Sequence, residues 1–144
     1  MMELKKELSA SDIKNIKLQD HQSGFLNGMS DEVLRIMEGF SFNYCVFKNE
    51  MPVGAFGVVP VTDKRGMAWA LLAGNLGCDM LFVYKNMKAL LDNQKTFSRI
   101  EMTADSSFIP AVKFAEMLGF QKEGLLRKYG LDGSDHYMFA RCYG

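Results

Sequence analysis

The pattern of apolar and polar positions in the first half of the chain predicts short elements separated by turns. Alternating apolar residues indicate strands, and apolar residues every three or four positions indicate helices. From the N-terminus we expect an edge strand over 2–8, a helix from Ser9 or Ser11 to about Leu18, irregular structure or a broken helix over 20–29, a helix from Ser30 to Gly39, and strands over 41–48, 53–61 and 67–73. The strand over 67–73 is apolar on both faces, so we expect it in the middle of a sheet.

The second half of the chain has a clearer helical pattern followed by a hairpin. We expect a helix over 78–91, a strand over 97–104, a helix over 108–118, and hairpin strands over 120–127 and 136–143. Gly119 follows the second helix directly, and a glycine in the left-handed conformation commonly ends a helix. We interpret Glu123-Gly124 as a bend or bulge in the first hairpin strand.

These elements define the expected fold class. Their order is β-α-α-β-β-β-α-β-α-β-β, in which a meander of strands is joined to β-α-β crossovers. Such an order implies an α/β protein with a mixed sheet and helices on both faces. No repeat, low-complexity tract or linker divides the sequence, so we expect a single domain over 1–144.

Composition and charge exclude several classes of protein. The chain is 48% hydrophobic and 24% charged, and its 17 basic residues balance 17 acidic ones. Zero net charge argues against a general binder of nucleic acid or anionic membranes. No apolar run reaches the length of a membrane span or forms the core of an export signal. We therefore expect a soluble cytoplasmic protein with no nucleic-acid or membrane partner.

The cysteines and histidines do not predict a metal centre. Cys45, Cys78 and Cys142 are far apart and show no CxxC spacing, which disfavours a disulfide framework or a zinc site. Cys45 and Cys142 lie in apolar or aromatic stretches, so we interpret both as small core residues. His21 and His136 are too isolated in the sequence to suggest a shared metal.

The C-terminal third resembles a known family. It contains a helical stretch, then Leu118-Gly119-Phe120, Glu123-Gly124 and Arg127, and it closes on the strand 135–141. This succession is similar to that of the GCN5-related N-acetyltransferases (GNAT), as are the order of elements and the Ser11-Asp12-Ile13 start of the first helix. The resemblance implies an acyl-CoA N-acyltransferase fold. Physically, Gly119 ends a helix and Phe120 enters the core, so this motif indicates fold rather than chemistry.

The resemblance also implies where coenzyme A would bind. Family members usually carry a Gln/Arg-x-x-Gly-x-Gly/Ala loop, whose amides open a helix and bind the pyrophosphate. The positions that correspond to this site are the strand end and turn formed by Leu71, Leu72, Ala73, Gly74, Asn75, Leu76, Gly77, Cys78 and Asp79. Gly77 matches the family loop, whereas Gly74 and Asp79 depart from it. Asp79 brings a like charge to a pyrophosphate and no basic residue occurs between Gly66 and Lys85, so we expect weak binding of coenzyme A.

The catalytic residues depart from the family as well. The position of the family's tyrosine acid is Ala115, and that of its frequent asparagine is Phe108; neither side chain transfers protons. Glu101, on the predicted strand 97–104, is a candidate general base by resemblance. Ser107 is a second candidate, although Ser106 and Ser107 are also suited to cap the next helix. Tyr84 is a further polar candidate, but it fits the apolar stripe of its helix.

Two functions remain open from the sequence. The first is an acetyltransferase that moves an acetyl group from acetyl-CoA directly to the amine of a small molecule or peptide, with an amide near Leu72 or Ala73 stabilising the oxyanion. The alternative is a catalytically degenerate GNAT-like protein of phage or prophage type with a binding or structural role. The segments 54–58 and 68–72 of this chain are similar to segments of acetyltransferase-like proteins encoded by phages and prophages. A homodimer through the last strands is implied by the family resemblance.

Overall fold

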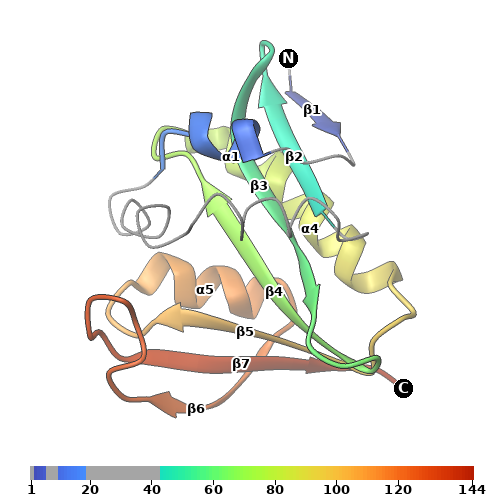
Figure 1. The fold of residues 1–144 in the computed structure, drawn as a ribbon, viewed down its shortest axis with the longest axis vertical. Helices are drawn as coiled ribbons and strands as arrows, with labels where there is room; N and C mark the ends of the chain where they lie inside the picture. The colour runs from blue at the N-terminus through green and yellow to red at the C-terminus, as the bar shows by residue number, and fades with distance from the viewer. Residues whose placement is uncertain (1, 6–9, 19–42) are drawn as a thin grey trace. The chain divides into compact units, whose positions relative to one another are not determined.

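The computed structural model describes residues 2–5, 10–18 and 43–144. Within these ranges, seven strands are hydrogen-bonded in the order β1-β2-β3-β4-β5-β7-β6 (Figure 1). The strands are β1 (Met2–Lys5), β2 (Asn43–Lys48), β3 (Met51–Pro60), β4 (Arg65–Leu72), β5 (Arg99–Asp105), β6 (Gln121–Leu126) and β7 (His136–Cys142). β4 and β5 are parallel, whereas the β1–β2, β2–β3, β5–β7 and β6–β7 pairs are antiparallel. The predicted mixed α/β fold class is therefore confirmed.

The helices are α1 (Ala10–Asn15), the 3₁₀-helix η2 (Gly77–Asp79), α4 (Met80–Asn93) and α5 (Ile109–Met117). The helix expected to reach Leu18 ends earlier, and Leu18 instead forms an isolated bridge with Ala73. The elements predicted over 20–29 and from Ser30 to Gly39 lie outside the described residues.

Contacts divide the chain into two compact units. The first lies within Met1–Val59 and Trp69–Met87, and the second comprises Pro60–Ala68 and Lys88–Gly144. The expectation of a single domain stays a prediction.

The first unit contains the β1–β2–β3 meander and the beginning of α4. Asn49 and Glu50 have positive φ angles of 50° and 69°, and Lys48 pairs with Met51 across them. A two-residue loop with this backbone matches the right-handed twist of a hairpin. Residues of β2, β3, α1 and α4 fill its core, including Ile13, Val46, Phe56, Val58 and Val83. β2 and β4 lie on the two sides of β3 in the sheet.

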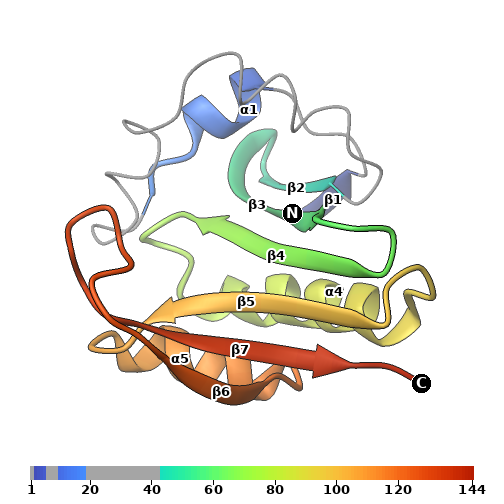
Figure 2. The same cartoon turned by 60° about the horizontal axis from the view of Figure 1, so that its bottom comes forward.

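The second unit is built on β5, β7 and β6, with α5 lying along them (Figure 2). β4 contributes its first residues, which pair with β5 from Arg65↔Arg99 to Met67↔Glu101. Ile100, Leu118, Phe120 and Phe139 form the core of this unit. The register of β6 with β7 shifts between Lys122 and Gly124, so the predicted bulge at Glu123-Gly124 is confirmed.

Gly119 ends α5 as predicted, with a φ of +94°. A β-carbon at this position would lie 3.2 Å from Nη1 of Arg141, whose guanidinium donates to the Leu118 carbonyl at 2.8 Å. We expect Gly119→Ala to lower the free energy of unfolding by about 1 kcal/mol, because an L-residue is strained at this φ. Urea unfolding measures the change. Gly124→Ala is the matched control, since nothing lies within 4 Å of a β-carbon there and its φ is ordinary; equal losses in the two variants would contradict the explanation.

The three cysteines have different surroundings. Cys45 is fully buried in β2, as predicted, and burial, aided by the negative charge of Asp12, raises the pKa of its thiol to about 12. Cys142 was expected in the core, and this expectation is wrong: the residue is exposed at the end of β7, with its sulfur 4.0 Å from Nη1 of Arg99. Cys78 is exposed in η2.

We expect two of the three thiols to react with a thiol reagent in the folded protein and the third only after unfolding. The reactive species is the thiolate, which burial at Cys45 suppresses. Counting the thiols that react with Ellman's reagent, with and without urea, checks this. Cys78→Ser and Cys142→Ser should each remove one fast-reacting thiol, and Cys45→Ala none. Three fast thiols in the folded protein would show that Cys45 is accessible.

None of the helices in the described ranges is both long and apolar enough to cross a bilayer. Over the same residues, no group of three or more histidine, cysteine and acidic side chains is arranged to hold a metal ion.

Candidate functional site

The end of β4 is buried and held from two sides. Leu71, Leu72 and Ala73 are 2%, 6% and 3% exposed. The Ala73 amide donates to the Val53 carbonyl of β3 at 2.9 Å, and the Gly74 amide donates to the Lys17 carbonyl at 3.0 Å. The residues at which the turn begins are therefore hydrogen-bonded to two other segments of the chain. The Ala73 amide would have to give up its bond to the Val53 carbonyl in order to bind an oxyanion. The oxyanion role suggested for an amide near Leu72 or Ala73 stays a prediction.

The turn from Gly74 to Asp79 connects β4 to α4. Leu76 is buried and anchors the turn, and the Leu76 carbonyl accepts from the Asp79 amide at 2.9 Å. Gly77 has a φ of +52°, and nothing lies within 4 Å of the place where a β-carbon would be. The amides of Gly77 and Cys78 bond to no acceptor among the described residues. Exposed amides at the positive end of a helix, with open space beside a glycine, are suited to an anionic group.

Asp79 does not stand alone in this turn. Its carboxylate Oδ2 is 2.5 Å from Nζ of Lys48, and the two side chains are 28% and 46% exposed. The sequence shows no basic residue between Gly66 and Lys85, but Lys48, which is distant in the sequence, compensates the charge of Asp79. Lys48 ends β2, and the hairpin that follows it brings the lysine to the η2 turn. The pair carries no net charge, so Asp79 repels an anion less than its sequence context implies.

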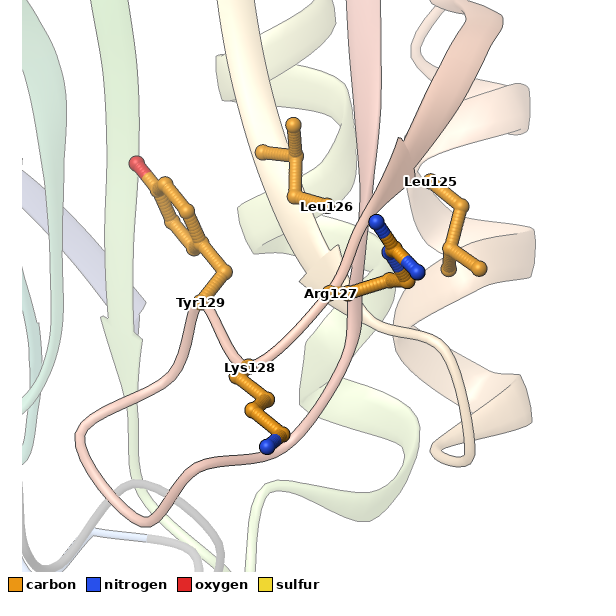
Figure 3. Close-up of a pocket in the computed structure, with 5 residues that line it drawn as sticks. All are labelled: Leu125, Leu126, Arg127, Lys128 and Tyr129. Carbon is orange, nitrogen blue, oxygen red and sulfur yellow. The ribbon is translucent and has the colours of Figure 1, made fainter.

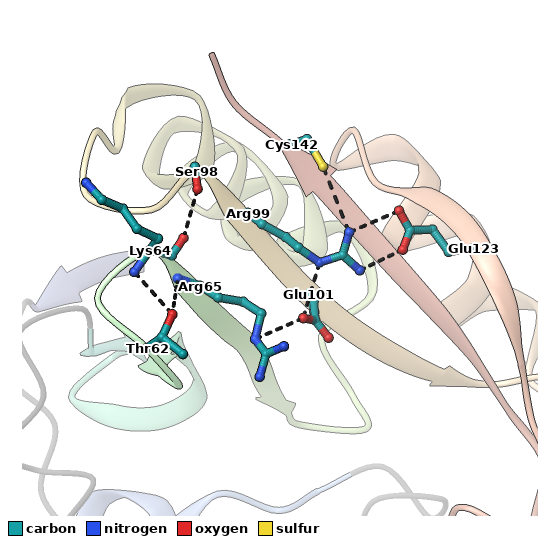
Figure 4. Close-up of polar contacts among 8 residues, drawn as sticks. All are labelled: Thr62, Lys64, Arg65, Ser98, Arg99, Glu101, Glu123 and Cys142. Atoms are coloured by element: carbon teal, nitrogen blue, oxygen red, sulfur yellow. Dashed lines mark hydrogen bonds and ion pairs between the residues drawn. The ribbon is translucent and has the colours of Figure 1, made fainter.

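Glu101 lies in an ion-pair network in the second unit (Figure 4). Its Oε1 is 3.3 Å from Nε of Arg65 and 3.2 Å from Nε of Arg99, and its side chain is 11% exposed. Arg99 also pairs with Glu123 through Nη2 at 2.6 Å and Nη1 at 3.1 Å. Glu123 points toward Arg99 at the β6 bulge. The hydrogen bond from Arg99, and its charge, hold the pKa of the Glu123 carboxyl below its usual range.

Ser107 lies at the other end of β5. Its hydroxyl and its amide both donate to Oδ1 of Asp105, at 2.8 Å and 2.9 Å. The suggestion that Ser106 or Ser107 caps the next helix is wrong, because Phe108 is the N-cap residue of α5 and makes no side-chain cap. Asp105 instead closes a local turn, as short acidic side chains commonly do at the end of a strand.

The structure does not bring Glu101 and Ser107 together. Asp105, which accepts the hydrogen bonds from Ser107, is the last residue of β5, and four residues of strand separate it from Glu101, a distance of about 13 Å at the usual rise of a strand. Ala115, at the position of the family's acid, is fully buried in α5. Tyr84 is half-buried on α4. The catalytic roles of Glu101 and Ser107 stay predictions.

Comparison with solved structures gives the class of fold. The chain superposes on a GNAT-family acetyltransferase from Bacillus anthracis with a TM-score of 0.69, 15% identity, and coverage of 98% of this chain and 94% of that one. It superposes on the ribosomal-protein-S18-alanine N-acetyltransferase from Escherichia coli with a TM-score of 0.69 and 15% identity, over 97% and 92% of the two chains. For Ard1 from Thermoplasma volcanium the TM-score is 0.72 and the identity 13%, over 98% and 97%.

These similarities extend over nearly the whole of each chain. The protein therefore has the GNAT acyl-CoA N-acyltransferase fold, and the resemblance noted in the sequence is confirmed for the fold. No protein-family model matches the sequence, and no curated protein matches it.

Proposed function

We propose that this protein is an N-acetyltransferase that uses acetyl-CoA and acetylates the amine of a small molecule or peptide. The observation that carries the proposal is the similarity of the fold to GNAT acetyltransferases over nearly the whole chain. The exposed turn that leads into α4 supports it. Solved structures with this fold include enzymes named for acetylation of a ribosomal protein and of spermidine. We further propose that it acts in the cytoplasm.

The residues of the first unit fit coenzyme A at the turn. The Gly77 and Cys78 amides would face the pyrophosphate, and the space beside Gly77 allows the backbone to be approached closely. Lys48 offsets the charge of Asp79 and would be close enough to attract a phosphate. The backbone from Leu71 to Ala73, hydrogen-bonded to β3 through the Ala73 amide, would guide the pantetheine arm.

Acetyl-CoA would supply an activated thioester, and the chain's own residues would mainly position the reactants. Neither Ala115 nor Phe108 transfers protons, so protonation of the departing thiolate would come from water or from another group. Holding an amine and a thioester in a reactive geometry supplies a large part of the barrier reduction on its own. A direct transfer is therefore compatible with this set of residues.

Calorimetric titration with acetyl-CoA and with CoA, at moderate salt, tests the proposal. We expect both to bind with dissociation constants of roughly 1–100 μM, which corresponds to about 5–8 kcal/mol. A panel of amines with detection of released thiol would then identify the acceptor. No binding up to millimolar CoA would contradict the proposal and favour the binding or structural role. Size-exclusion chromatography with light scattering would test the predicted homodimer.

A further inference from the structure

The strand β5 lies inside the sheet, between β4 and β7, yet one of its faces is polar. Side chains alternate along a strand, so one face of β5 carries the apolar residues Ile100, Met102 and Ala104. The other face carries Arg99, Glu101, Thr103 and Asp105. Glu101 is only 9% exposed, and a charged residue is seldom so buried unless it has partners. This polar face belongs to the second unit and contains none of the residues proposed for coenzyme A.

The ion-pair network on this face has one open end, at Arg65 (Figure 4). Arg99 uses all three nitrogens of its guanidinium, Nε for Glu101 and both terminal nitrogens for Glu123. Arg65 uses Nε alone, 3.3 Å from Oε1 of Glu101, and its side chain is 46% exposed. Its two terminal nitrogens have no partner among the described residues, and in Figure 4 they point away from Arg99 and Glu123. The network therefore ends in two exposed pairs of N–H donors.

The backbone of Arg65 is held in place as well. Its amide donates to Oγ1 of Thr62 at 3.0 Å, and its carbonyl accepts from the amides of Val61 and Thr62 at 2.8 Å and 3.0 Å. Arg65 is also paired with Arg99 in the register of β4 with β5. Because the backbone and Nε are both positioned, the guanidinium loses less conformational freedom on binding a ligand than an arginine on a free loop would.

The charge and shape of this open end select the kind of ligand. Two terminal nitrogens in the plane of a guanidinium match the two oxygens of a carboxylate. Arg65 brings a single positive charge, and the negative charge of Glu101 is beside it. A monoanion is therefore better suited than a dianionic phosphate, which Glu101 would repel more strongly. A polyamine would meet a like charge at the same place.

We propose that the terminal nitrogens of Arg65 bind a carboxylate, and that this carboxylate belongs to the acceptor. The acceptor is then an amino acid or a peptide with a free carboxyl group rather than a polyamine. Glu101 links the two parts of this proposal, because it contacts Arg65 and is the candidate base for the acceptor amine. The assignment to the acceptor rests on the proposed function; the carboxylate site itself does not.

Heteronuclear NMR of the arginine side chains tests the site without acetyl-CoA. Loss of one Nε–H signal in Arg65→Lys assigns the Arg65 resonance, and the backbone amides of Thr62 and Arg65 provide a second readout. Acetate and alanine bring a carboxylate, alaninamide and spermidine bring amines alone, and inorganic phosphate brings a dianion; sodium chloride keeps the ionic strength constant. We expect acetate and alanine to shift the Arg65 signals in a saturable way in the millimolar range. Phosphate should bind more weakly than acetate, and the two amines should have no effect.

Two variants separate the arginine fork from a general effect of positive charge. Arg65→Lys keeps the charge but removes the planar pair of donors, so it should weaken carboxylate binding at least about threefold. Lys64→Ala is the matched control, because it removes a charge from the same turn but its side chain points away from Arg65 in Figure 4. We expect Lys64→Ala to bind acetate as the unchanged protein does. A dispersed amide spectrum confirms that each variant is folded.

Three results would overturn the carboxylate site. The first is that neither acetate nor alanine shifts the Arg65 signals more than chloride does. The second is that phosphate binds more tightly than acetate. The third is that folded Arg65→Lys keeps full affinity.

Activity with acetyl-CoA tests the assignment to the acceptor, with a panel of amino acids that are each compared with their own amides. We expect the amino acids to show the lower KM. Arg65→Lys should raise that KM about tenfold and leave kcat nearly unchanged, because a contact far from the reacting atoms is equally strong in the ground state and the transition state. A higher kcat/KM for the amides or for spermidine would contradict the assignment.

These outcomes are distinguishable from the test of coenzyme A binding. Carboxylate binding at Arg65 without any affinity for CoA would contradict the proposed acetyltransferase and leave the carboxylate site standing. Affinity for CoA without carboxylate binding at Arg65 would do the reverse.

Discussion

Replacing Glu101 by alanine is expected to lower the free energy of unfolding by about 2 kcal/mol, because a nearly buried carboxylate that serves two guanidinium groups is lost. Arg65 and Arg99 both direct Nε at the same oxygen of Glu101, so its removal leaves two like charges close together. The loss is smaller than for a fully buried pair, since the arginine side chains are 46% and 31% exposed. Urea unfolding followed by circular dichroism gives the value.

Glu101→Gln is the matched variant, because it keeps the shape and one acceptor oxygen while removing the charge. We expect it to lose about half as much stability, since a neutral acceptor bonds a guanidinium more weakly. A loss close to zero in both variants would show that the network is a solvated surface feature. The same variant tests the predicted base role of Glu101: a general base requires a fall in rate of about 100-fold or more at unchanged substrate binding.

The second large effect is expected on coenzyme A affinity when the Lys48–Asp79 pair is broken. Lys48→Ala should weaken binding by roughly fivefold to tenfold, because it leaves an uncompensated carboxylate in the first turn before α4. Asp79→Ala should tighten binding by about 0.5–1 kcal/mol, since it removes the like charge and frees Lys48 to meet a phosphate. The double variant should bind nearly as the unchanged protein does. Calorimetry with CoA measures all four proteins.

Two controls make this prediction specific. Lys88→Ala removes a lysine that is also paired with an aspartate, Asp92, but this pair lies further along α4, away from the turn at Asp79. We expect no change in CoA affinity for that variant. Raising the salt concentration should shrink the Lys48 and Asp79 effects, because exposed charges are screened. Unchanged affinity in both single variants would show that the pair does not lie beside the bound phosphates.

Local pattern was enough to predict most of the elements that the structure describes. The stop at Gly119 and the bulge at Glu123-Gly124 are decided by residues within a few positions, because backbone conformation there depends on nearest neighbours. The strand expected over 53–61 begins earlier, at Met51, so the turn before it is shorter than predicted. The helix expected to reach Leu18 ends at Asn15 because Leu18 bridges to Ala73, a partner that local pattern does not show. Cys142 is a second case: it lies at the last residue of β7 and is exposed there, although the apolar residues before it predict a core position.

The candidate site shows the same division. The sequence by itself determined the order of the elements, the turn that leads into α4 and the loss of the family's acid at Ala115, because these are properties of single segments. Only the tertiary structure decided that Lys48 offsets Asp79 and that Arg65 joins Arg99 at Glu101. Such contacts depend on strand register and on the direction of each side chain, which are fixed when distant segments pack together.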